Sequence, residues 1–113
     1  MLTIYHNSRC SKSRQTLELI RQNSTKKLTI IEYLKKPLTQ IEITQILSLL
    51  SCKPIDMMRA KEPEFKEQRL ASASDEQLIN AMVTTPKLIE RPIVSDGNQA
   101  IIGRPPENVL VLC

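Results

Sequence analysis

Apolar and polar residues follow two different periods along this chain, and the change of period separates its ends from its middle. Leu2–Tyr5 alternates apolar with polar residues, and residues 28–32 are apolar and β-branched, so both segments predict strands. Between them Ser11–Asn23 predicts a helix with Leu17 and Ile20 on its inner face. Strand, helix and strand at this spacing form a βαβ unit, so we expect the two strands to be parallel.

The middle of the chain has the period of helices. Thr39 with Glu42, and Ser74 with Gln77, form two capping boxes that predict helix starts. Behind the first lie apolar residues at helical spacing, namely Ile43, Ile46, Leu47 and Leu50. Behind the second lie Leu78, Ile79, Met82 and Val83. Residues 54–69, between these helices, predict one or two short helices.

The last part of the chain returns to strands. Pro86 ends the second long helix, because proline cannot continue one. Residues 93–95 and 100–102 predict a hairpin, since Gly97 in the intervening Asp-Gly pair tolerates the positive φ of a turn. The prolines at 105–106 suit the first turn of a short final helix.

This order predicts an α/β chain with a thioredoxin-like fold. We expect a mixed four-stranded sheet with a helical insertion between a βαβ half and a ββα half. A small α/β sandwich of another topology is the structural alternative. The length of 113 residues suits a single domain spanning residues 1–113.

The amino-acid composition makes some classes of binding partner less plausible than others. The formal charge is +4, but aromatic residues make up only 3% of the chain, which disfavours nucleic-acid binding because single-strand readers stack bases on aromatic rings. No apolar run approaches the ~20 residues of a membrane span, and residues 1–5 show no secretory leader, so we expect a cytoplasmic protein with no membrane partner. One histidine and three scattered cysteines make a poor metal site, so no metal is expected.

The turn between the first strand and the first helix carries the candidate chemistry. Cys10 stands at the predicted helix start, where unpaired backbone N–H groups and the helix dipole stabilise a thiolate. Arg9, Lys12 and Arg14 add positive charge, and the same features bind an oxyanion. The alternative is that Cys10 is a spectator in a basic loop.

No second cysteine lies one helical turn from Cys10, since Ser13 stands where a CxxC motif has its partner. An external thiol is therefore the expected means of regenerating Cys10. Cys52 follows apolar residues and is expected to be a small core residue, and Cys113 ends the chain, where it is expected to fray. Their roles and the oligomeric state stay open.

The chain resembles the glutaredoxin-dependent arsenate reductase family. The likeness is carried by Tyr5-His6-Asn7-x-x-Cys10-x-x-Ser13-Arg14-x-Thr16-Leu17, Met58-Arg59, Lys87-Leu88-Ile89-x-Arg91-Pro92-Ile93-Val94 and Gly103-Arg104-Pro105, in the family's order. The chain ends nine residues after Arg104, which favours the short chromosomal branch of that family.

The resemblance implies a thioredoxin-like fold and reduction of arsenate to arsenite. By its pattern Cys10 is the nucleophile, His6 assists the thiolate, and Arg59, Arg91 and Arg104 bind the oxyanion. A Cys10 thiol–arsenate adduct is then resolved by glutathione and glutaredoxin, with glutathione as co-substrate and no bound cofactor. Thioredoxin-like folds also place a cis-proline beside the active cysteine, which here predicts a cis Arg91–Pro92 bond.

Three other functions fit these residues less well. A phosphatase-type arsenate reductase needs an arginine six residues after its cysteine, and Thr16 stands there. A redox-responsive, RNA-polymerase-binding regulator of the same fold usually carries CxxC. A glutathione-dependent thiol reductase would have no use for three arginines.

Overall fold

The order of elements follows the predicted one. The computed structural model describes residues 1–113. Its strands, α-helices and 3-10 helices are β1 (Leu2–Tyr5), α1 (Ser11–Asn23), β2 (Leu28–Ile31), α2 (Gln40–Leu50), η1 (Pro54–Met57), α3 (Pro63–Glu67), η2 (Leu70–Ser72), α4 (Asp75–Thr84), η3 (Pro86–Leu88), β3 (Ile93–Ser95), β4 (Ala100–Ile102) and η4 (Pro106–Leu112). None of the helices is long and apolar enough to cross a membrane.

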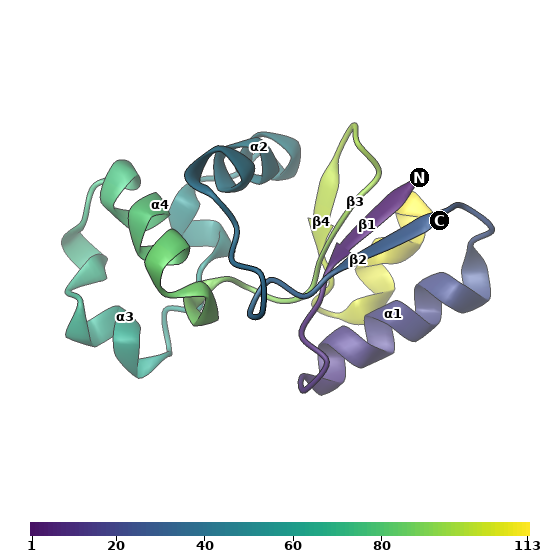
Figure 1. Cartoon of the computed structure of the whole chain (residues 1–113), viewed down its shortest axis with the longest axis horizontal. Helices are drawn as coiled ribbons and strands as arrows, with labels where there is room; N and C mark the ends of the chain where they lie inside the picture. Colours follow the sequence, from purple (N-terminus) through teal and green to yellow (C-terminus); the bar gives the residue numbers. More distant parts are fainter. The chain divides into compact units, whose positions relative to one another are not determined.

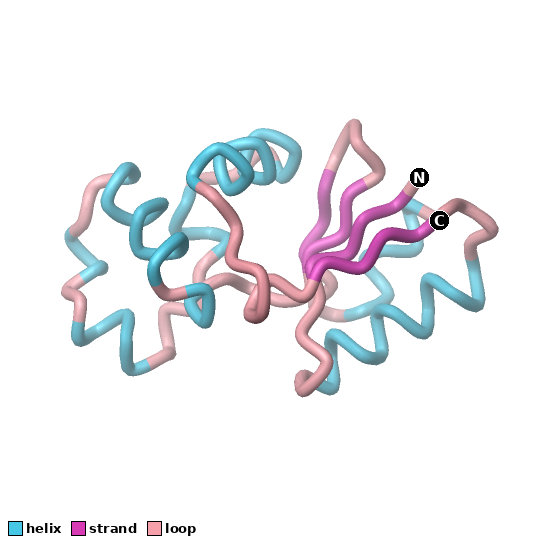
Figure 2. The backbone as a smooth tube through the Cα atoms, in the orientation of Figure 1, coloured by secondary structure: helices cyan, strands magenta, loops and turns pink.

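The four strands form one mixed sheet in the order β2-β1-β3-β4 (Figures 1 and 2). β1 pairs with β2 in parallel, with Leu2 opposite Leu28, as the βαβ spacing predicted. β1 and β3 are antiparallel, as are β3 and β4. This topology confirms the thioredoxin-like fold, and it puts β1, which leads into the Cys10 loop, at the centre of the sheet.

The core of the sheet is aliphatic. α1 and η4 pack together on the same face of the sheet, where β1 contributes Leu2 and Ile4 and β3 contributes Val94 (Figure 1). Ile20 from α1 and Val109 from η4 complete this cluster, and all five residues are buried. Alternation along β1 therefore selects the buried residues, as its pattern indicated.

The chain divides into two compact units. The first comprises Met1–Lys36 and Arg91–Cys113 and contains the whole sheet, and the second is Pro37–Glu90. The second unit is the helical insertion that the sequence predicted. The assignment of residues 1–113 to a single domain stays a prediction.

The helical unit is organised by its caps. The Thr39 hydroxyl accepts from the Glu42 N–H at the start of α2, and the Ser74 hydroxyl accepts from the Gln77 N–H at the start of α4, so both capping boxes are confirmed. α2 and α4 pack on each other. The predicted apolar faces are buried in part only, because Leu50, Ile79 and Val83 remain half-buried.

The predicted hairpin at the C-terminal end is confirmed, with Gly97 at a positive φ of 93° and the Asp96 carboxylate accepting from the N–H groups of Asn98 and Gln99 in its loop. Two other details differ from the prediction. The last helix is a 3-10 helix that begins at Pro106, one residue late. Cys113 does not fray, because it packs against the core cluster beneath η4.

Candidate functional site

Cys10 is the N-cap residue of α1, with extended backbone angles of φ −94° and ψ 123°. The loop before it is held by local hydrogen bonds. The Cys10 N–H donates to the Asn7 carbonyl at 3.0 Å, and the Arg14 side chain donates to the Ser8 carbonyl at 2.9 Å. The Cys10 side chain is only 9% exposed. The sulfur therefore lies at the N-terminus of α1, where neighbouring residues cover most of it.

The pKa of the Cys10 thiol lies below its ordinary value of 9.0. Burial is the largest single influence and opposes ionisation, because a charge loses hydration there. It is outweighed by the backbone N–H groups of Ser13 and Lys12 and by the hydrogen bonding and charge of Arg91. The thiolate of Cys10 is therefore favoured by hydrogen-bond donors at the start of α1 and by Arg91.

Two arginines from the other end of the sheet unit meet the sulfur. Arg104 Nη2 lies 3.8 Å from Cys10 Sγ, and Arg104 Nε donates to the Arg91 carbonyl at 2.8 Å. Arg91 contributes to the lowered Cys10 pKa, yet its Nε is buried without an acceptor. An unsatisfied buried donor beside a thiolate is a place where an oxyanion oxygen can bind.

Both arginines precede cis peptide bonds. Arg91–Pro92 is cis, as the resemblance predicted, and Arg104–Pro105 is also cis, which the sequence did not indicate. The Gly103 N–H donates to the Pro92 carbonyl at 2.8 Å, so the segments that carry the two arginines are joined. Both arginine-bearing segments belong to the unit that contains the sheet.

His6 lies in the same loop but does not bond the sulfur directly. It is 6% exposed, and its Nδ1 lies 2.6 Å from the hydroxyl of Ser13, which also accepts from the Asn7 N–H at 3.0 Å. Ser13 is fully buried, and Nδ1 is the one acceptor that its O–H group reaches, so the hydroxyl donates to Nδ1 and His6 is assigned as the neutral Nε2–H tautomer. Burial lowers the pKa of His6, in agreement with the neutral form.

The sequence interpretation did not single out Ser13 as part of the candidate site. It is fully buried, and it supplies both a backbone donor toward Cys10 and the hydroxyl that holds His6. The signal was present in the pattern, because Ser13 and Thr16 occupy the buried face of α1 with Ile20, where apolar residues are the rule.

Arg59 belongs to the helical unit. Its guanidinium forms an ion pair with Glu62, which also lies 3.6 Å from Lys87 Nζ. Its backbone is fixed by a hydrogen bond from the Arg59 N–H to the Leu88 carbonyl at 2.7 Å, beside the isolated bridge between Met58 and Ile89. The structure thus gives Arg59 a fixed backbone and an acidic partner, and its role stays a prediction.

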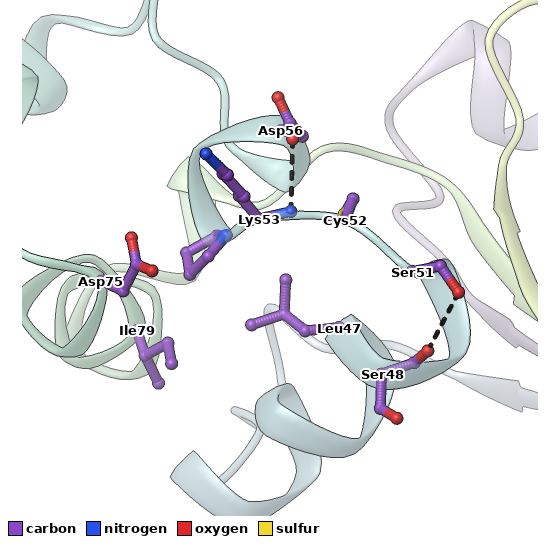
Figure 3. Close-up of a pocket in the computed structure, with 9 residues that line it drawn as sticks. Leu47, Ser48, Ser51, Cys52, Lys53, Asp56, Asp75 and Ile79 are labelled. Atoms are coloured by element: carbon purple, nitrogen blue, oxygen red, sulfur yellow. Dashed lines mark hydrogen bonds between the residues drawn. The ribbon is translucent and has the colours of Figure 1, made fainter.

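The other two cysteines differ from Cys10 in ionisation. Cys52 lines an open depression of the helical unit, next to Lys53, whose N–H donates to Asp56 (Figure 3). Burial and the Asp56 carboxylate raise the pKa of Cys52, and burial raises that of Cys113. Cys52 is half-buried rather than a core residue.

Cys113 lies at the far end of α1 from Cys10. It packs on the cluster that contains Ile20, and Lys26, beyond the C-terminus of α1, donates to the Leu112 carbonyl at 2.7 Å. A helix of thirteen residues is about 20 Å long. Cys113 is therefore out of reach of the Cys10 sulfur in this structure.

Comparison with known proteins agrees with this arrangement. A family model described as the ArsC family matches residues 5–112. The chain belongs to the ArsC family. It is 47% identical over 110 residues to "Uncharacterized protein YfgD" of Escherichia coli K12, covering 95% of this chain and 92% of that protein. It is 42% identical over 111 residues to "Arsenate reductase" of Haemophilus influenzae, covering 95% and 94%.

A solved structure supports the same assignment of this ArsC-family chain. "Arsenate reductase from Vibrio cholerae" superposes with a TM-score of 0.93 at 42% identity, covering 99% of this chain and 97% of that one. The thioredoxin-like fold of the family is thus shared over the whole length compared.

Proposed function

We propose that this protein reduces arsenate to arsenite, with Cys10 as the nucleophile. The proposal rests on one observation above all. Arg91 assists ionisation of Cys10 and keeps a buried Nε donor without an acceptor, and Arg104 approaches the same sulfur. A nucleophile and donors for an oxyanion thus coincide, as reduction of a tetrahedral oxyanion requires. The relatives called arsenate reductases support the choice of arsenate.

The chemistry begins with the thiolate. Cys10 attacks arsenic, a sulfur–arsenic bond forms, and one arsenate oxygen leaves as water after protonation. Arg91 and Arg104 are placed to neutralise charge on the remaining oxygens, since guanidinium groups donate in pairs to such anions. Arg59, held by Glu62, is the third arginine proposed for the oxyanion.

Two external thiols supply the electrons. Glutathione adds to the Cys10–arsenic adduct with loss of a second oxygen as water. The glutaredoxin thiolate then attacks the glutathione sulfur, a disulfide forms, and the electron pair of the broken sulfur–arsenic bond reduces arsenic to the trivalent state. Hydrolysis releases arsenite and restores the Cys10 thiol. The sum is one arsenate and two thiols giving arsenite, one disulfide and water.

This scheme needs no bound cofactor and suits the cytoplasm, where glutathione keeps thiols reduced. It also needs no second cysteine of this chain. That agrees with the raised pKa values of Cys52 and Cys113, because a thiol that stays protonated is a poor nucleophile.

The test is NADPH consumption in the presence of arsenate, glutathione, glutaredoxin and glutathione reductase. We expect arsenate-dependent turnover that Cys10→Ser abolishes and that the matched controls Cys52→Ser and Cys113→Ser retain. Arg91→Met should raise KM for arsenate. Retained turnover in Cys10→Ser would refute the assignment of the nucleophile. Absence of arsenate-dependent turnover in the wild type, with Cys10 readily alkylated, would refute arsenate as substrate.

A further inference from the structure

A cavity of about 230 Å³ opens beside the Cys10 loop, within the sheet unit. Its walls come from two places, the loop after β1 and the turn after β2. The first supplies His6 and Arg9, and the second supplies Glu32 and Lys35. The proposed reaction assigns the oxyanion to the arginines at Cys10 and leaves this cavity without a role.

The cavity carries both signs of charge. Lys35 Nζ lies 3.4 Å from Glu32 Oε1, and these side chains are 75% and 39% exposed, so the pair is weak and its members can exchange partners. The Arg9 side chain makes no hydrogen bond or ion pair in the protein, since only its backbone N–H is engaged, by Asn7. Two cations and one carboxylate therefore face a ligand that enters here.

His6 adds a donor. It is 94% buried, Ser13 occupies its Nδ1, and its Nε2 makes no hydrogen bond within the protein. Since His6 lines the cavity and Ser13 engages only its Nδ1, the Nε2 N–H is available to donate to a ligand there. This observation is independent of the charges, and it selects a ligand with an acceptor oxygen.

We propose that this cavity binds the α-amino-acid end of the co-substrate glutathione, the γ-glutamyl group. The inference rests on the proposed function for the identity of the thiol. The α-carboxylate of that group suits Arg9 and Lys35, and its α-ammonium suits Glu32. A bare oxyanion is disfavoured because it would meet the Glu32 carboxylate at close range.

Size and position agree with this occupant. The cavity is smaller than the ~300–1,000 Å³ sites that enclose whole drug-sized ligands, so it takes one end of the tripeptide. Arg9 is the residue next to Cys10 in the chain, and the cysteinyl thiol of glutathione follows its γ-glutamyl group directly. Binding in the cavity therefore leaves that thiol near the Cys10 adduct.

The direct test uses S-methylglutathione, which cannot react, titrated into the full-length protein and followed by backbone amide chemical shifts. The largest shifts should fall at residues 6–9 and 32–35. Glu32→Gln and Lys35→Gln should each weaken binding about fivefold, a modest factor because the charges are partly exposed. Lys36→Gln, a matched loss of charge on the same turn but outside the cavity, should bind as the wild type does.

Kinetics provide the second measurement. In the coupled assay Glu32→Gln should raise KM for glutathione about fivefold and leave KM for arsenate unchanged. In the chemical-shift titration, S-methylcysteinylglycine, which lacks the γ-glutamyl end, should bind the wild type and Glu32→Gln with equal affinity.

Several results would overturn the inference. These are shifts centred on Pro92 instead of the cavity, equal affinities in all variants, or binding of S-methylcysteinylglycine as tight as that of S-methylglutathione. If S-methylglutathione binds in the cavity while arsenate-dependent turnover is absent, the proposed function fails and the site stands. If turnover is present and the variants keep the wild-type KM for glutathione, the site fails alone.

Discussion

Gly103 sits where the two arginine-bearing segments meet α1, and no larger residue fits there. A Cβ atom at Gly103 would lie 2.8 Å from Thr16 Oγ1, 2.9 Å from Pro92 Cγ and 3.1 Å from Thr16 Cγ2. Neither neighbour can move cheaply. Thr16 is fully buried, and its hydroxyl donates to the Lys12 carbonyl at 2.8 Å, while Pro92 is a rigid buried ring.

Gly103→Ala should therefore overpack this contact and cost about 1–3 kcal/mol of stability. For a small domain the urea m-value is about 2 kcal/mol/M, so a loss of about 2 kcal/mol lowers the unfolding midpoint by about 1 M. Urea unfolding followed by circular dichroism measures this directly. A midpoint equal to or above that of the wild type would refute the steric argument.

A double-mutant cycle isolates the clash with Thr16. Thr16→Ala removes both Oγ1 and Cγ2, so Gly103→Ala should cost about 1 kcal/mol less in that background than in the wild type. Gly97→Ala is the control, because its Cβ meets no atom within 4 Å and its cost comes from the φ of 93° alone. The losses of stability caused by Gly97→Ala and Thr16→Ala should be additive. Additivity of Gly103→Ala with Thr16→Ala would contradict the geometry.

Three further predictions follow from the ionisation of the cysteines and from a helix cap. At near-neutral pH iodoacetamide should modify Cys10 before Cys52 and Cys113, as mass spectrometry of peptides will show, because the pKa of Cys10 is lowered and those of the other two are raised. Since the native pKa of Cys10 lies below its value of 9.0 in the unfolded chain, wild type should gain stability over Cys10→Ala as pH rises from the native pKa toward 9.0, and lose that gain as pH falls, in urea unfolding at a series of pH values. Ser74→Ala should cost about 1 kcal/mol by removing the acceptor for the Gln77 N–H, measured by thermal unfolding.

The helices and strands of this fold could be predicted from the sequence because local sequence signals agree with the tertiary structure. Both capping boxes form, α1 spans the predicted residues, and the βαβ spacing correctly indicates a parallel pair. Misses occurred where tertiary packing overrides local pattern. Cys113 looks like a fraying terminus in sequence, yet contact with the core cluster orders it, and only the fold could bring that cluster to the chain end.

Only the part of the candidate site whose residues are close together in the sequence could be predicted from the sequence. Placing Cys10 at a helix start follows from a strand, a turn and a helix in succession. The approach of Arg104 to Cys10 spans 94 residues and depends on how β3 and β4 return beside β1. Without the resemblance, no spacing in the sequence would have indicated it, and Ser13 was overlooked because a serine on a helix is usually solvent-exposed.

The arrangement at Cys10 reconciles two demands that oppose each other. A thiolate and an oxyanion are both negative, so the charge that stabilises one is partly lost to the other. In the proposed reaction we expect Arg91 to meet both demands with different atoms, because its interaction with the sulfur leaves the buried Nε unsatisfied. A buried donor without an acceptor costs about 1–3 kcal/mol, and an oxyanion that accepts from it recovers that energy. Oxyanion binding therefore need not displace the thiolate from its donors, since the backbone N–H groups of Ser13 and Lys12 continue to stabilise the sulfur.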